Sequence, residues 1–147
     1  MNEAEQLKNT LTSIFKRRGH DGNYTRLFEN LEPAHRETLL SKIELERSEL
    51  PVIGSVEGYD NWLIITTERV VWHSAGREQS LRVRDIQDVV ADFQGLVATG
   101  RKKEEMRELQ VLCANGERQT LELEAGAPLM GVWNALKNLG TRNRRQA

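Results

Sequence analysis

Residues 61–73 constrain the fold of this chain more than any other stretch. Two apolar runs rich in β-branched and aromatic residues, 62–65 and 70–72, flank the polar tetrapeptide 66–69. Apolar runs on either side of a short polar turn are typical of a tight β-hairpin. The sequence therefore predicts a hairpin near the middle of the chain.

The spacing of apolar residues predicts further strands around this hairpin. The apolar residues of 52–56 indicate a strand before it. After it, two apolar residues of 81–84 alternate with Arg82 and Arg84, which is the period of a half-buried strand with a basic outer row. The β pattern then continues over 86–95, so the middle of the chain is predicted to be largely sheet.

The last part of the chain predicts a second hairpin and a closing helix. Alternating residues at 109–113 and 120–124 flank Asn115-Gly116, a dipeptide that favours a type I′ turn, so these strands should pair directly. Apolar residues at helical spacing over 127–139 then predict an amphipathic helix. Gly140 is expected to end that helix.

Residues 1–50 show the period of helices instead of strands. We predict one amphipathic helix over 7–18, a short one over 24–30 and a third from Pro33 to about Ser48. Short amphipathic helices are marginal on their own. They are therefore expected to dock either on the rest of this chain or on another chain.

These patterns divide the chain into three parts. Residues 1–50 form an N-terminal helical extension, residues 51–141 form the sheet-rich domain, and residues 142–147 form a polar tail that we expect to be frayed. The fold class predicted is α+β.

Composition limits the kind of molecule this can be. The chain has 147 residues and 21 Lys plus Arg against 22 Asp plus Glu, a net charge of −1. Bulk electrostatic binding to nucleic acid or an anionic membrane needs a positive excess, so both are disfavoured. Cys113 is the single cysteine, and neither a secretory signal nor a membrane-spanning run is evident. The sequence predicts a cytoplasmic protein.

The residues that usually carry catalysis are scattered. His20, His35 and His73 have no partner at metal-ligand spacing, and Cys113 lies in an alternating strand, where a buried and inert thiol is expected. The aspartates of 85–92 lack the loop spacing of a calcium site, and the chain has no glycine-rich phosphate loop. We predict no enzymatic activity, no metal and no cofactor.

The order of strands and closing helix resembles the bacterial pleckstrin-homology-like domains, which share their fold with the PH and GRAM domains. The resemblance lies in W-L-I-I-T-T-E-R-V-V-W at 62–72, similar to that family's apolar, Thr, Arg, apolar hairpin. The segment L-R-V-R-D-I-Q-D-V at 81–89 and the last helix with Trp133 add to it, and the match covers roughly 51–140.

The resemblance implies a strongly bent antiparallel sheet of about seven strands, near-barrel in shape, with the C-terminal helix covering one open end. If Trp133 is fully buried in that cover, its replacement by alanine should cost about 3–5 kcal/mol. Lipid-binding members of the family carry basic residues in the first inter-strand loop. Here the corresponding loop, 57–61, is acidic, so the phosphoinositide function does not carry over.

Protein recognition is the function that the sequence favours: a non-catalytic module that acts in an assembly, with a homo-oligomer as one form of it, or as a regulator. Such a module would offer a partner a sheet edge or a groove beside the closing helix. Alternatives that stay open are an immunity protein that neutralises a bacterial toxin, and weak binding of anionic lipid or of nucleic acid with Tyr59 or Trp72 stacking on bases. The candidate partner-binding residues are Tyr59, Arg82, Arg84, Arg101, Lys102 and Lys103.

Overall fold

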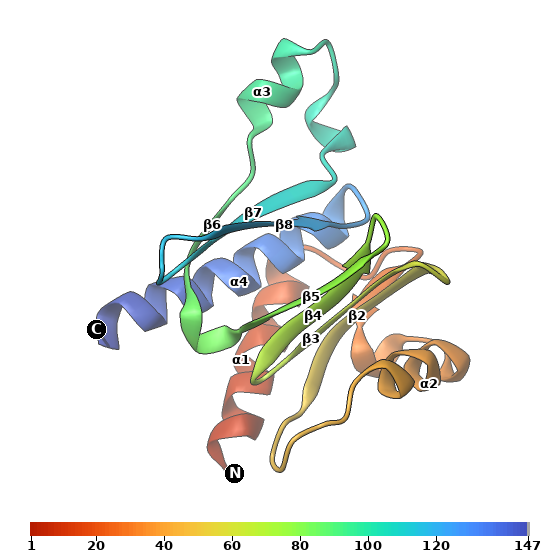
Figure 1. The fold of residues 1–147 in the computed structure, drawn as a ribbon, viewed down its shortest axis with the longest axis vertical. Coiled ribbons are helices and arrows are strands. Elements are labelled where there is room, and N and C mark those ends of the chain that lie inside the picture. Colours follow the sequence, from red (N-terminus) through yellow and green to blue (C-terminus); the bar gives the residue numbers. More distant parts are fainter. Residues whose placement is uncertain (147) are drawn as a thin grey trace.

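The computed structural model describes residues 1–146 and shows an α+β fold with two antiparallel sheets and a long C-terminal helix (Figure 1). The helices are α1 (Glu3–Arg18), α2 (Pro33–Lys42), α3 (Phe93–Ala98) and α4 (Ala127–Gln146), with 3-10 turns η1 (Phe28–Asn30), η2 (Val83–Asp85) and η3 (Lys103–Glu105). The strands are β1 (Thr25–Leu27), β2 (Pro51–Gly58), β3 (Asn61–Thr66), β4 (Arg69–Ser74), β5 (Arg77–Arg82), β6 (Ile86–Val90), β7 (Glu108–Cys113) and β8 (Arg118–Glu122).

The first sheet has five strands in the order β1-β2-β3-β4-β5, and the second has three in the order β6-β7-β8. No hydrogen-bonded ladder joins the two sheets within residues 1–146. The predicted hairpin of 61–73 is confirmed as β3 and β4, with Leu63 opposite Trp72 and Ile64 opposite Val71. The predicted direct pairing of β7 with β8 is also confirmed.

The type I′ turn lies at a different hairpin from the one predicted. Between β7 and β8 only Gly116 has a positive φ, of 88°, and its N–H donates to Cys113 C=O, which makes a type I turn followed by a left-handed glycine. The prediction for Asn115-Gly116 is therefore wrong in turn type. The two-residue turn between β4 and β5 is the type I′ turn, since φ is 52° at Ala75 and 76° at Gly76.

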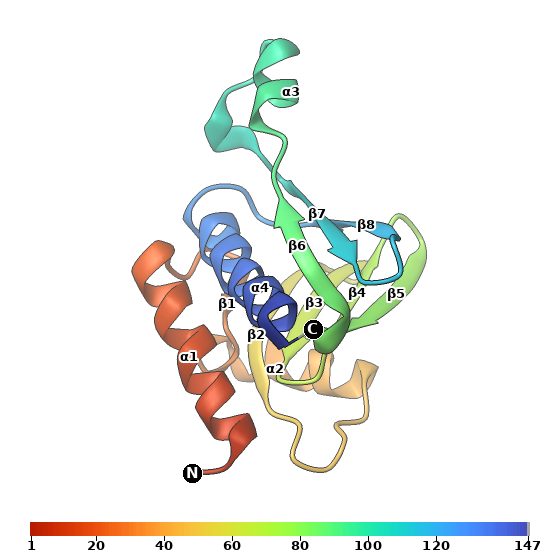
Figure 2. The same ribbon diagram turned by 90° about the vertical axis from the view of Figure 1, so that its left-hand side faces the viewer.

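The two faces of the five-stranded sheet pack against two separate hydrophobic cores. The inner face packs with the second sheet, α1 and α4, and the outer face is covered by α2 (Figures 1 and 2). Alternate residues of β3 separate in this way, because successive side chains of a strand point to opposite faces. Leu63 and Ile65 belong to the inner core, and Trp62 and Ile64 to the outer one.

Helix α4 lies along β6, and α1 lies beside α4 (Figure 2). The approach of α1 depends on Gly131, because a Cβ there would come within 2.6 Å of the Phe15 ring. Leu11, Ile14 and Phe15 are buried in the same core as α4. The first helix therefore docks within this chain.

The C-terminal helix differs from its prediction in two ways. Gly140 does not end it, since the helix continues to Gln146 and only Ala147 lies outside the described residues. A Cβ at Gly140 would lie 2.7 Å from Gln87 O, so this glycine permits close approach to β6. Trp133 is only partly buried, so the full-burial cost predicted for its loss does not apply.

Three other boundaries are corrected. Residues 24–30 form β1 and η1 instead of a helix, because Thr25–Leu27 pairs with β2 and the Thr25 hydroxyl bonds to Ser55. The helix from Pro33 ends at Lys42, after which Ile43 is extended. The β pattern of 86–95 stops at Val90, since Asp92 caps α3 by accepting from Gly95 N–H.

The segment 91–107 forms an arm that projects from the body at the top of both views (Figures 1 and 2). It contains α3 and η3. Phe93 packs on Trp133 at 5.7 Å between ring centroids, and Arg107 forms an ion pair of 2.7 Å with Glu57 on β2. These two contacts hold the base of the arm.

Candidate functional site

The candidate residues predicted on the five-stranded sheet lie at its opposite ends. Tyr59 occupies the turn between β2 and β3, where its ring is 85% exposed and lies 5.1 Å from Lys42 Nζ. Arg82 lies at the far end of β5, where it forms a bidentate ion pair with Glu46. Arg84 follows it, exposed, in η2. The sheet therefore separates Tyr59 from the two arginines.

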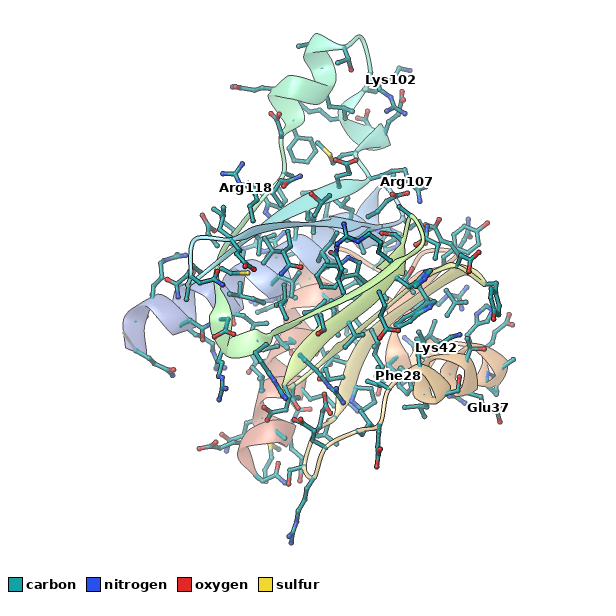
Figure 3. All side chains as sticks on the ribbon, viewed as in Figure 1. Phe28, Glu37, Lys42, Lys102, Arg107 and Arg118 are labelled. Carbon is teal, nitrogen blue, oxygen red and sulfur yellow. The ribbon has the colours of Figure 1, made fainter. Side chains whose placement is uncertain are left out.

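The remaining candidates, Arg101 to Lys103, lie on the arm. Arg101 pairs with Glu105 at 3.4 Å. Figure 3 shows Lys102 at the end of the arm, away from Lys42 on α2. The predicted basic residues thus do not gather on one surface. Trp72 is buried, 2% exposed, so it is not available to stack on a base.

The four strands at the sheet edges offer a different kind of site. An edge strand has N–H and C=O groups that its own sheet does not pair, and these can hydrogen-bond another chain. The sheet orders make β1 and β5 the edges of one sheet and β6 and β8 the edges of the other. These four edges differ in whether their outward groups have partners.

The β1 edge is sealed by side chains from both ends of the chain. Glu124 accepts Thr25 N–H at 2.9 Å, and Asp21 accepts Leu27 N–H at 2.8 Å. Gly22 N–H donates to Thr25 C=O at 2.8 Å. The outward groups of this short strand are therefore already paired.

The carboxylate of Glu124 also holds the main chain that leads into β1. Besides Thr25, it accepts the N–H groups of Asn23 and Tyr24 at 2.8 and 2.7 Å. Burial opposes its ionisation, but the three N–H donors outweigh burial and lower the pKa of Glu124. The side chain is thus ionised where it holds the edge.

The β6 edge is sealed by α4. Trp133 Nε1 donates to Val89 C=O at 2.9 Å, and the Arg144 guanidinium donates to Gln87 C=O. Val89 N–H donates to Asp88 Oδ1 at 2.8 Å. A partner strand would have to displace the closing helix to reach this edge.

An ion pair supports the same seal. Lys137 Nζ lies 3.1 Å from Asp88 Oδ1. Burial opposes ionisation of Asp88, but the Lys137 ammonium and the Val89 N–H outweigh it and lower the pKa of Asp88. The predicted groove beside the closing helix is therefore filled along β6 by side chains of this chain.

The hydrogen-bonded ladder between β7 and β8 shows which N–H and C=O groups of β8 point away from the sheet. The bond from Cys113 N–H to Glu117 C=O makes Glu117 a residue that faces β7. Pairing alternates along an antiparallel ladder, so Gln119 and Leu121 face β7 as well. The residues whose N–H and C=O groups point away are Arg118, Thr120 and Glu122.

The same reasoning applies to β5. The two-residue turn makes the main-chain groups of Arg77 face β4. After the other end of β5, the bond from Val83 N–H to Glu68 C=O shows that the main chain of Val83 also faces β4, so the odd-numbered residues of β5 do so. The residues whose main-chain groups point away are Glu78, Ser80 and Arg82. Within residues 1–146, no hydrogen bond reaches the outward main-chain groups of β5 or β8.

The two open edges line one seam between the sheets. Hollows of about 260 and 400 Å³ lie along it, and each is lined by residues of β5 and of β8 or its turn. The start of β8 lies beside the end of β5, because Glu117 and Leu81 share one hollow while Glu122 and Arg77 share the other. The strands therefore run antiparallel across the seam (Figure 1).

Cys113 lies at one end of this seam and is buried. Burial raises the pKa of its thiol, and the nearby carboxylates Glu117 and Asp85 raise it further. A thiol in this setting stays protonated, which suits a core residue.

A buried ion pair explains the Thr and Arg of the central hairpin. Glu49, 4% exposed, accepts from Arg69 Nε at 2.9 Å and from the Thr66 hydroxyl. Burial opposes ionisation of Glu49, but these two donors lower the pKa of its carboxyl. The cluster ties the loop after α2 to the β3–β4 turn and occupies both carboxylate oxygens of Glu49.

The arm has hollows on both sides of its base. One of about 450 Å³ lies between the arm and β7, and one of about 440 Å³ lies between the arm and the start of α4. Met106 lines both, and Phe93, Leu129 and Met130 make the second one largely apolar. The first hollow shares Glu122 with the seam, whereas no residue that lines the second also lines the seam.

Residues 1–146 contain neither a cluster of metal-binding side chains nor a helix suited to span a membrane. In that range no three or more His, Cys, Asp or Glu side chains gather where they could hold a metal ion. None of the helices described there has the length and apolar composition of a bilayer span.

The sequence led us to expect an exposed sheet edge but did not identify β5 and β8 as the open ones. The outward groups are main-chain atoms, so residue types do not reveal them, and their direction depends on the ladder register. The contact between α4 and β6, in contrast, can be recognised from the sequence of α4. Trp133, Lys137, Gly140 and Arg144 recur on one helix face, at the spacing of a helix that lies along a strand.

No protein-family model and no curated protein matches this chain.

Proposed function

We propose that this chain is a non-catalytic protein-binding module with a pleckstrin-homology-like fold, which acts in a protein assembly or as a regulator. In this proposal the two sheets are the walls of a near-barrel, and α4 is its closing helix. The order from β2 to α4 supports the assignment: seven strands precede one long helix, and the arm with α3 is inserted between β6 and β7. So does the hairpin of β3 and β4, whose Thr66 and Arg69 share Glu49.

One observation carries the functional part of the proposal. The outward main-chain groups of β5 and β8 have no partner within residues 1–146, whereas the N–H groups of Thr25 on β1 and Val89 on β6 are bonded. Proteins usually block such edges, because an open one pairs with other chains. Two blocked edges beside two open ones fit a chain that reserves one seam for a partner.

The mode of binding that follows is strand addition. An extended segment of the partner would pair its main chain with β5 or β8, and main-chain hydrogen bonds would supply affinity. Side chains along the seam would supply specificity, and Gln79 and Gln119 are half-buried there. This mode needs no lipid headgroup, no nucleotide and no metal.

Edge prolines test the proposal. Thr120→Pro and Ser80→Pro each remove an outward N–H and place a ring on the edge, without removing a ladder bond. Random peptides displayed on phage are selected on the wild-type protein, and the enriched peptides are then measured against each variant by biolayer interferometry. We expect at least one edge proline to reduce binding about tenfold or more, because a strand cannot pair past a proline.

Thr120→Ala and Ser80→Ala are the matched controls. They shorten the same side chains and keep the N–H groups, so they should bind the selected peptides as the wild type does. Peptides that bind both proline variants and the wild type equally would refute recognition at the seam. Circular dichroism of each variant confirms that the sheet is intact.

A further inference from the structure

We infer that β8 pairs antiparallel with β8 of a second copy of this chain, centred on Thr120. The inference rests on the proposed function in that it uses one of the same open edges, and it names the occupant of that edge. An antiparallel pair of identical edges is related by a two-fold axis, so the contact closes on itself as a dimer. The second sheet would then run β6-β7-β8 and continue into the same three strands of the other copy.

The register of β8 suits this pairing. Its outward residues are Arg118, Thr120 and Glu122. When Thr120 faces Thr120 of the second copy, each Arg118 faces Glu122 of the other copy. The residues whose main-chain groups point outward then lie directly opposite one another, as the hydrogen-bonded pairs of an antiparallel ladder do.

The side chains in this register complement one another. Opposite charges and Thr–Thr pairs directly across two strands are favourable. Both charged groups are available, because Arg118 and Glu122 are exposed and form no ion pair within residues 1–146. Figure 3 shows Arg118 on the second sheet.

A repulsion between two glutamates of one chain also favours pairing of β8 with a second copy. Glu122 lies directly opposite Glu108 on β7, and both side chains are exposed. Like charges opposite one another weaken a strand pair. Arg118 of the second copy would arrive beside Glu122 and offset this repulsion, which nothing else in the described ion pairs does.

The other open edge is less suited to a second copy. Strand β5 has a similar pattern, with Glu78, Ser80 and Arg82 pointing outward. However, Arg82 is held by Glu46 through two bonds of 2.8 Å. In the same two-fold arrangement at β5, Arg82 would have to leave Glu46 to pair with Glu78 of the second copy, whereas the arrangement at β8 breaks no ion pair. Strand β5 is therefore left for a different partner.

Charge reversal on the full chain tests the dimer, with sedimentation velocity across a range of protein concentrations as the readout. The wild type should dimerise. Arg118→Glu and Glu122→Arg should each weaken the dimer about tenfold or more, because each places like charges opposite one another. An equal mixture of the two single variants should dimerise again, since the introduced glutamate of one variant would face the introduced arginine of the other. The double variant R118E/E122R should also recover.

Glu78→Arg is the matched control, because it reverses an exposed charge on β5 and should leave the dimer unchanged. A wild type that stays monomeric at every concentration, or single variants that dimerise as the wild type does, would overturn the inference. Mixtures that fail to recover would overturn the register. None of these results touches peptide binding at β5, which Ser80→Pro measures separately, so the proposed function and the dimer can fail independently.

Discussion

The two edges of the three-stranded sheet receive opposite treatment. Along β6, α4 places a tryptophan N–H, an ammonium and a guanidinium against the strand, and Gly140 lets the helix come close enough for them to reach. Along β8, the outward main-chain groups meet only the seam. The comparison shows that β6 is blocked by specific donors from α4 that bind its main chain, whereas β8, which lacks such donors, can still pair with another strand.

The largest expected effect comes from placing proline on the two sides of β8. Gln119 faces β7, so Gln119→Pro removes a ladder bond and should lower the free energy of unfolding by about 3 kcal/mol. Thr120 faces the seam, so Thr120→Pro should cost less than about 1 kcal/mol. Urea denaturation measures both. Equal costs would show that the ladder phase assigned to β8 is wrong.

Removing the cap of β1 should have the next largest effect. Glu124→Ala leaves the N–H groups of Asn23, Tyr24 and Thr25 without their acceptor and should lower the free energy of unfolding by about 1–3 kcal/mol. Glu117→Ala, an exposed glutamate in the β7–β8 turn whose side chain makes no hydrogen bond within residues 1–146, is the control and should change little. If the two variants are equally stable, Glu124 does not seal the edge.

The same carboxylate predicts a dependence on pH. The pKa of Glu124 is lowered in the folded state from its ordinary value of 4.5, so the stability it contributes is present above pH 4.5 and is lost as the pH falls through the folded pKa. Glu124→Gln should therefore reduce the loss of stability on acidification below pH 4.5. Thermal unfolding at several acidic pH values measures this, and an unchanged acid slope would contradict it.

A smaller effect is expected from opening β6. Trp133→Phe keeps most of the ring that packs on Phe93 but removes the N–H that donates to Val89 C=O, at a cost of about 1 kcal/mol. Phe93→Leu, which changes the packing and keeps the N–H, is the matched comparison. If Trp133→Phe leaves both stability and peptide binding unchanged, the seal does not depend on that bond.

The smallest effect concerns the turn that sets the register of β5. Ala75 has a φ of 52°, a region that alanine adopts at a cost and that asparagine tolerates better. Ala75→Asn should raise the free energy of unfolding by about 0.5–1 kcal/mol. Guanidinium denaturation measures the gain, and a loss of stability would contradict a type I′ turn here.

Local patterns were enough to predict part of this fold. The hairpin of 61–73 and the pairing of β7 with β8 follow from residues close together in sequence, and both are confirmed. The spacing of Tyr24, Leu27 and Phe28 predicts a helix over 24–30, which is wrong. The actual partner of this segment is β2, about which the local pattern carries no information.

The site was harder to predict for the same reason. The seal of β1 joins Thr25 to Glu124, which lies 99 residues away, and the register of β8 decides which amides point outward. The predicted basic residues were identified by charge alone. They lie at separate ends of the molecule, and Arg82 and Arg101 are already paired with carboxylates.

Amide hydrogen exchange measured by NMR tests the difference between the edges most directly. The amides of Thr25 and Leu27 on β1 and of Val89 on β6 have acceptors in this chain, so they should exchange slowly. The amides of Ser80 and Thr120 have none within residues 1–146, so at concentrations where the chain is monomeric they should exchange at close to the rate of an unstructured peptide. Protection of Ser80 and Thr120 equal to that of Thr25 and Val89 in the monomer would contradict the account.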